Sequence, residues 1–173
     1  AGLARDLMFQ AEGVPPLGYR TYRLRPRSEP PTFTDMVAAS ATTLESPFYR
    51  IELDPATGFA DSILDRESGR ELVNSDVVHP FGAVLVRDPH GGPRMPTLQG
   101  IEAGRGGALS GSLRAAFTVH GHPRIEVTYR LFANEKRLDV AIALLKDPTP
   151  LLEAYAAFPF GMPRGRFRYE GPL

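Results

Sequence analysis

Acidic side chains gather between Ser46 and Val73, in the stretch SPFYRIELDPATGFADSILDRESGRELV. The acids of this stretch are Glu52, Asp54, Asp61, Asp65, Glu67 and Glu71. Paired carboxylates roughly 5–10 Å apart are the groups that many glycosidases place on either side of a glycosidic bond. The alternative is structural, because an aspartate at the start of a turn accepts hydrogen bonds from the backbone two residues further on.

Asp54 and Asp65 both begin short sequences that are typical of turns. In DPATG the proline presets φ and Gly58 adopts a positive φ without strain, and DRESG ends in the same way on Gly69. The two aspartates then lie at opposite ends of one short strand, which does not bring their carboxyl groups together across a cleft. We therefore predict a meander of strand, turn, strand, turn and short strand, with acids at its corners and no catalytic residue.

Two of the four histidines, His120 and His122, are separated by a single residue. On a strand this spacing puts both imidazoles on one face, where a metal ion could bridge them. Gly121 and Pro123 indicate a turn, however, and no third ligand is near in the sequence. We expect a solvated hairpin here and assign no metal ligand to the chain.

Candidates for substrate binding are few. His79 and His90 flank a loop-rich segment from which an imidazole could reach a cleft, although a surface position is the alternative. Near the C-terminus RGRFRY alternates arginine with aromatic residues, and Arg166 and Tyr169 could contact a sugar ring. The alternative for this segment is a strand with its arginines in solvent. The candidates for substrate binding are therefore His79, Arg166 and Tyr169.

The glycine-rich segment 104–111, GRGGALSG, is the last motif with a chemical precedent. It lacks the Lys-Ser/Thr pair of a phosphate-binding loop. Ser110 also lacks the first glycine of a nucleophile elbow. We predict a flexible loop.

Composition narrows the classes of function. The chain has 173 residues, with 20 Lys and Arg balanced by 20 Asp and Glu, so charge offers no basis for binding nucleic acid or an anionic membrane. No apolar run approaches the roughly 18–20 residues of a membrane span. Cysteine is absent, which excludes disulfides, thiolate-bound zinc and a cysteine nucleophile. A cysteine-free chain is compatible with the cytoplasm, where we expect it.

Apolar and polar residues alternate along several segments, the pattern of half-buried strands. The apolar stripes are Tyr49/Ile51/Leu53, Leu113/Ala115/Phe117/Val119, Ile125/Val127/Tyr129/Leu131, Leu138/Val140/Ile142/Leu144 and Ala154/Ala156/Phe158/Phe160. The continuous apolar run Phe81–Val86 predicts a strand buried on both faces. No segment shows a convincing helical period. These patterns predict an all-β protein, an antiparallel β-sandwich.

The chain divides into three parts by composition. Residues 1–25 contain the strand-like GYRTYRL and are expected to be the end of a preceding β segment. Residues 26–43 are proline-rich and aperiodic, which predicts a linker, and residues 44–173 form the sandwich. We expect the chain to be a fragment of a larger polypeptide, with unpaired strand edges that favour dimerisation or aggregation.

Several motifs occur in an order that resembles one enzyme family. They are FYRIELDPATGFADSILDRESGRELV, the upstream VPPLGYRTYRL, the strand pair SLRAAFTVHGHPRIEVTYRLFANEKRLDVAIAL, and EAYAAFPFGMPRGRFRYEGP. Together they resemble the β-sandwich region of glycoside hydrolase family 38, the α-mannosidases. Members of that family carry a tryptophan-containing segment where this chain has HPFGAVLVRDPHGGPRMP, and this chain has no tryptophan.

The resemblance implies a galactose-mutarotase-like supersandwich and a parent enzyme that hydrolyses α-mannosides with retention. It also implies that the zinc ion and the nucleophilic aspartate belong to an N-terminal catalytic domain, which would be the partner of this module. The chain itself is then expected to be inactive, with no cofactor of its own. Two alternatives stay open: a free-standing carbohydrate-binding module that uses Phe167 and Tyr169, and a mutarotase-like sugar epimerase that pairs His79 with Glu153 or Glu170.

Overall fold

The computed structural model describes residues 8–26, 28–29, 32–33 and 36–162, and it contains eleven β-strands and no helix within them. The predicted all-β antiparallel sandwich is confirmed. Within these ranges there is no helix long and apolar enough to cross a membrane. The candidates Arg166 and Tyr169, like Glu170, lie outside the described residues.

The first layer is a five-stranded antiparallel sheet in which the strands follow one another in sequence order. Its strands are β1 (Ala38–Ala39), β2 (Thr43–Glu45), β3 (Tyr49–Leu53), β4 (Ala60–Asp65) and β5 (Arg70–Glu71). The last three are the predicted meander. Its two turns end on Gly58 and Gly69, with φ of 75° and 66°, as the turn sequences predict.

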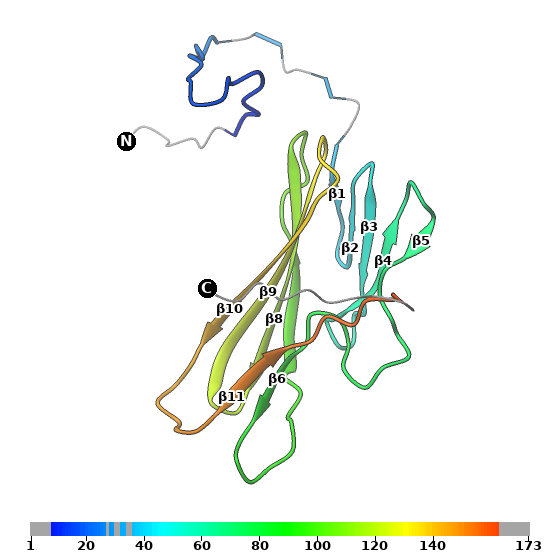
Figure 1. The fold of residues 1–173 in the computed structure, drawn as a ribbon, viewed down its shortest axis with the longest axis vertical. Helices are drawn as coiled ribbons and strands as arrows, with labels where there is room; N and C mark the ends of the chain where they lie inside the picture. Colours follow the sequence, from blue (N-terminus) through cyan, green and yellow to red (C-terminus); the bar gives the residue numbers. More distant parts are fainter. Residues whose placement is uncertain (1–7, 27, 30–31, 34–35, 163–173) are drawn as a thin grey trace.

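The second layer is a four-stranded antiparallel sheet in the order β10-β9-β8-β7. Its strands are β7 (Thr97–Ala103), β8 (Ser110–Val119), β9 (His122–Phe132) and β10 (Leu138–Leu145). A separate antiparallel ribbon pairs β6 (Val84–Arg87) with β11 (Glu153–Ala156). Figure 1 shows the five-stranded sheet beside the upper part of the long strands and the ribbon beside their lower part.

A single apolar core fills the space between the layers. It is built from the predicted stripes of β3, β8 and β9, together with Phe59, Ile63 and the run that begins at Phe81. The rings of Phe59 and Phe117 stack with their centroids 5.0 Å apart. Each fully buried side chain of this kind contributes roughly 1.5–3 kcal/mol relative to an exposed one. Strand alternation therefore places most of the stabilising surface between the two sheets.

Two of the predicted stripes are less buried than the alternation suggests. On β10 the side chains of Leu138, Val140 and Ile142 are half-buried and Leu144 is exposed. The stripe from Ala154 to Phe160 is exposed at each of its four positions, so its predicted burial is wrong. β10 is an edge strand of the four-stranded sheet, and β11 belongs to a ribbon of only two strands. The run Phe81–Val86, by contrast, is buried throughout, as predicted.

The N-terminal part departs from the predicted pattern as well. The segment GYRTYRL, described from Gly18 to Leu24, contains no strand, and its side chains are exposed. The sheet begins inside the stretch assigned to a linker: Val37 is buried, and its amide donates to the carbonyl of Gly107 at 2.9 Å. Gly111 makes this possible, because a Cβ there would lie 2.6 Å from Cγ1 of Val37.

Candidate binding site

The acids of the meander cap its turns. The Asp54 carboxylate accepts hydrogen bonds from the amide of Ala56 at 2.9 Å and the hydroxyl of Thr57 at 2.8 Å, and these bonds lower its pKa. Lys136 lies 3.0 Å from Asp65 and holds the pKa of that carboxyl below its usual range, with help from the amides of the DRESG turn. The predicted structural role of these aspartates is confirmed.

Glu71 joins three segments of the five-stranded sheet through one carboxylate. It accepts hydrogen bonds from the Ser62 hydroxyl at 2.6 Å and from the amides of Ile63 at 2.8 Å and Val73 at 2.9 Å. Partial burial alone would raise the pKa of Glu71. The hydrogen bonds outweigh it, so the pKa lies below its ordinary value.

We predict that Glu71→Ala lowers the free energy of unfolding by about 1–3 kcal/mol at neutral pH, because three donors lose a charged acceptor. Glu71→Gln should cost less, since the amide oxygen still accepts. A depressed pKa stabilises the fold above the unfolded-state pKa, and the contribution disappears as pH falls through the folded-state value. The difference in the free energy of unfolding between the wild type and Glu71→Gln should therefore become smaller at acidic pH.

Urea unfolding at pH 7 and at stepwise lower pH measures this effect. Asp61→Asn is the matched control, because Asp61 is an exposed acid on β4, the strand that pairs with the β5 strand of Glu71. An equal loss of stability in Asp61→Asn would contradict the assignment.

The histidines of the β8–β9 hairpin have different environments. Val119 pairs with His122 across the hairpin, and Gly121 has a φ of 76° in its turn, so the predicted hairpin is confirmed. His120 is exposed, but His122 is only 2% exposed, and the prediction that both are solvated is wrong. A register shift between Phe117 and Val119 changes the alternation and turns His122 inward.

The half-buried His79 has a buried Nδ1 for which the described residues provide no hydrogen-bond partner. Glu153, its suggested partner in sugar epimerisation, instead binds Arg87 at 2.7 Å and the hydroxyl of Tyr155 at 2.7 Å. The structure therefore records no hydrogen bond between His79 and Glu153.

Zinc is the one cofactor that the family resemblance implies. Within the described ranges no three His, Asp or Glu side chains come together as a metal-binding group. Those residues do not fit a zinc site, and no chemical step is assigned to zinc in this module.

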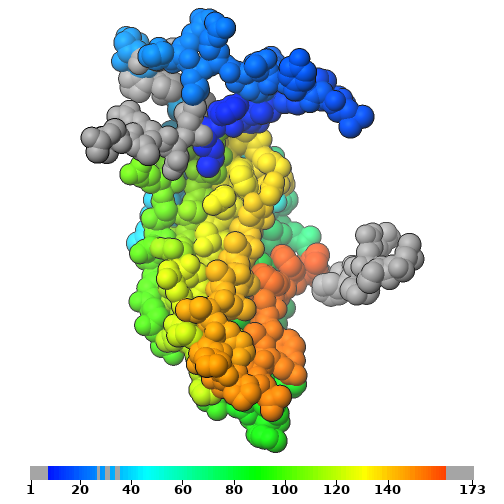
Figure 2. All heavy atoms as spheres, turned by 90° about the vertical axis from the view of Figure 1, so that its left-hand side faces the viewer, coloured from blue at the N-terminus to red at the C-terminus, as the bar shows by residue number. Residues whose placement is uncertain are grey.

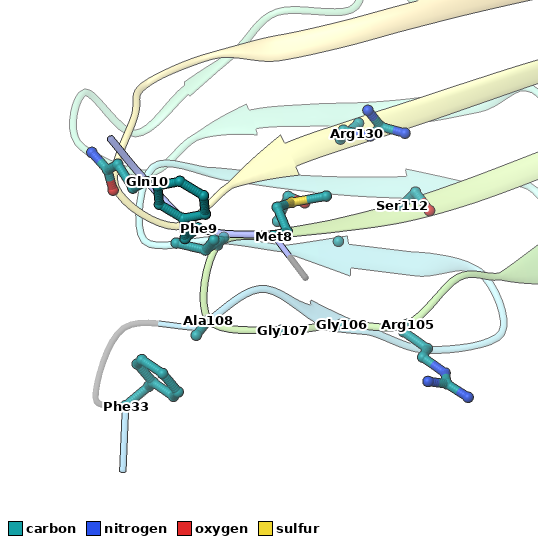
Figure 3. Close-up of a pocket in the computed structure, with 13 residues that line it drawn as sticks. Met8, Phe9, Gln10, Phe33, Arg105, Gly106, Gly107, Ala108, Ser112 and Arg130 are labelled. Carbon is teal, nitrogen blue, oxygen red and sulfur yellow. The ribbon is translucent and has the colours of Figure 1, made fainter. Parts of the chain in front are cut away.

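A cavity of about 660 Å³ lies at the end of the sandwich where the N-terminal segment meets the glycine-rich loop. Residues 105–112 form one wall, and Met8, Phe9 and Phe33 come from the N-terminal segment. Figure 3 shows Met8 and Phe9 on one side of the loop, Phe33 on the other, and Arg130 on β9. The site combines two aromatic rings, two guanidinium groups and the exposed backbone of a glycine pair.

Several contacts hold the N-terminal segment at this cavity. The Asn134 amide donates to Gln10 Oε1 at 2.9 Å, and the Ser110 hydroxyl lies 3.7 Å from the sulfur of Met8. The rings of Phe9 and Tyr22 lie 5.0 Å apart. Figure 2 shows the segment lying across the end of the sandwich.

The sequence patterns do not predict this cavity. Of the candidates for substrate binding, His79 does not line the cavity, and Arg166 and Tyr169 lie outside the described ranges. The pattern of the glycine-rich segment predicts only a flexible loop. Its small residues are the one feature of the sequence that could have indicated a place where another segment or a ligand packs closely. Glycine permits a close approach of backbone to backbone or to a ligand, and here residues 106–111 accommodate Val37 and the N-terminal segment.

No model of a known protein family matches the chain, and no curated protein matches it.

Proposed function

We propose that this chain is a non-catalytic β-sandwich module of a glycoside hydrolase whose parent enzyme cleaves α-mannosides with retention. Support comes from the ordered motifs that resemble family 38 and from the antiparallel sandwich to which the motifs from Phe48 onward contribute their strands. The acids in the stretch FYRIELDPATGFADSILDRESGRELV cap turns and bond to the sheet, which supports a structural role for them. The role of the module is to pack against the catalytic domain.

The proposal that the module packs against the catalytic domain rests on one observation. Large apolar side chains are exposed along the N-terminal segment. Leu17, Tyr19 and Leu24 expose three quarters or more of their surface, with values of 111%, 88% and 76%. Several large apolar side chains exposed close together in the sequence are a feature of segments that bind another protein surface. The resemblance implies that the catalytic domain precedes this segment, so these side chains are in the position to contact it.

The chain alone should not hydrolyse an aryl α-mannoside, because acid–base chemistry needs positioned groups that its described residues do not bring together. The measurement is release of the aryl group by the purified 173-residue chain, with and without a metal chelator. Robust, chelator-sensitive hydrolysis would overturn the assignment.

The reading frame that encodes the chain tests the proposed parent directly. A metal-binding α/β domain encoded upstream is the expected result. In that full-length protein, Leu24→Asp should loosen the domains and increase proteolysis after this segment, whereas Leu151→Asp, an equally exposed site elsewhere, should not. Equal proteolysis of both variants would count against docking through the N-terminal segment.

A second function, carbohydrate binding, is supported by the aromatic rings and guanidinium groups at the cavity. If the module binds sugar there, Phe9→Ala and Arg130→Ala should each weaken binding of mannose oligosaccharides about tenfold, a loss of about 1.4 kcal/mol. Arg124→Ala, on the same strand β9 but away from the cavity, is the control. Calorimetric titration measures this, and no heat at millimolar sugar would remove the binding function while leaving the docking role intact.

A further inference from the structure

Strand β10 is an open edge of the four-stranded sheet. It pairs with β9 on one side, from Leu138↔Leu131 to Leu145↔Arg124, and no strand among the described residues pairs with its other side. Figure 1 shows β10 at the outer edge of the sheet, and Figure 2 looks onto that side of the molecule. The backbone groups along this edge are therefore available to another strand.

From Val140 onward the residues of β10 lack the usual protection of an edge. From Val140 to Leu145 the sequence VAIALL contains no charge, proline or glycine. Leu144 and Leu145 are 47% and 56% exposed. Natural sheets protect an exposed edge with lysine, proline or a bulge, and a long apolar edge without them pairs with another chain.

The core side of the same edge opens into an apolar groove of about 630 Å³. Leu138 and Val140 form one wall, and Phe81, Phe158 and Phe160 contribute to the other. Phe158 and Phe160 both contact Phe81 edge-on, at 5.3 and 5.2 Å between ring centroids. A strand added to β10 would carry apolar side chains over this groove.

The centre of β10 is nearly symmetric about Ile142: within RLDVAIALLKD, residues 137 to 147, the stretch VAIAL reads almost the same in both directions, whereas Leu138 and Asp139 do not match Lys146 and Leu145. In an antiparallel pair related by a two-fold axis at Ile142, opposed residues share a face. Ile142 then faces its copy, and Val140 faces Leu144 of the second chain. At each end Arg137 faces Asp147, which pairs opposite charges. A shift by two residues in either direction would oppose Asp139 to Asp147, or Lys136 to Lys146.

We propose that β10 is a self-association edge, at which a second copy of this chain adds its own β10 in antiparallel register about Ile142 and joins two four-stranded sheets into one. Symmetry and end-charge complementarity favour a second copy over an unrelated strand. The inference is independent of the parent enzyme and its reaction.

Sedimentation velocity over a concentration series tests the proposal. The wild-type chain should form a dimer, and Ala143→Lys should weaken it about tenfold or more, because Ala143 is exposed and the two ammonium groups would lie near each other. Ala103→Lys is the matched control: it puts the same exposed residue on β7, the opposite edge of the same sheet, and should leave the dimer unchanged. Circular dichroism checks that each variant is folded.

A charge exchange tests the register. Arg137→Asp and Asp147→Arg should each be monomeric alone, because each opposes like charges at both ends. An equimolar mixture should form heterodimers, since both ends then pair opposite charges. A monomeric wild type, equal effects of Ala143→Lys and Ala103→Lys, or a mixture that stays monomeric would each overturn the proposal.

Discussion

Replacing Phe117 with alanine should lower the free energy of unfolding by about 3–5 kcal/mol, the range for a large aromatic removed from a close-packed core. Phe117 is 1% exposed and stacks on Phe59 at the centre of the interface between the two sheets. Since small domains are stable by about 5–15 kcal/mol, this one change removes a large share of the total.

Chemical denaturation followed by circular dichroism measures the loss. Phe132→Ala is the control, because Phe132 is half-buried on the outer face of β9, where its ring lies 5.1 Å from the guanidinium carbon of Arg137. It should cost about 1 kcal/mol. Similar losses at positions 117 and 132 would contradict a core located between the sheets.

Gly82→Ala should be the second most damaging substitution, with a loss of about 2–5 kcal/mol. Gly82 has a φ of 82°, a conformation that costs an alanine roughly 1–2 kcal/mol. A Cβ at this position would also overlap the hydroxyl of Tyr129, and overpacking adds about 1–3 kcal/mol. Tyr129 cannot easily move, because it is buried and its hydroxyl donates to the carbonyl of Phe81 at 3.4 Å.

Gly69→Ala separates the two effects. Gly69 has a φ of 66°, but no atom lies within 4 Å of its added Cβ, so only the conformational strain of about 1–2 kcal/mol applies. In a double-mutant cycle Tyr129→Phe should relieve part of the damage of Gly82→Ala by about 0.5–3 kcal/mol. Additive losses in the cycle would show that the overlap with Tyr129 is not the cause.

The layers and most of the core follow from local patterns in the sequence. Alternation identifies the buried faces of β3, β8 and β9, and Asp-Pro-x-x-Gly chemistry identifies the turn between β3 and β4. Alternation says which side of a strand is apolar, but not whether another layer covers that side. This explains why Leu144 and Phe160, which belong to well-formed stripes, are exposed.

The environment of single residues depends on features that a sequence pattern does not encode. One register shift after Phe117 turns His122 from solvent into the interior. The cavity depends on contacts between residues as far apart as Gln10 and Asn134, and no local motif predicts such a contact. The proposed enzymatic context depends on the ordered motifs, since local geometry does not determine a substrate.

The β6–β11 ribbon is closed by partners 66 positions apart, Arg87 and Glu153, and the entire four-stranded sheet lies on the chain between them. Closing so long a loop is entropically unfavourable until the intervening hairpins have shortened it. We therefore expect the hairpins from β7 to β10 to form first, and β6 and β11 to pair last. A nascent chain still on the ribosome would then hold β6 without its partner until residue 156 has emerged, which leaves that buried apolar strand dependent on chaperones during synthesis.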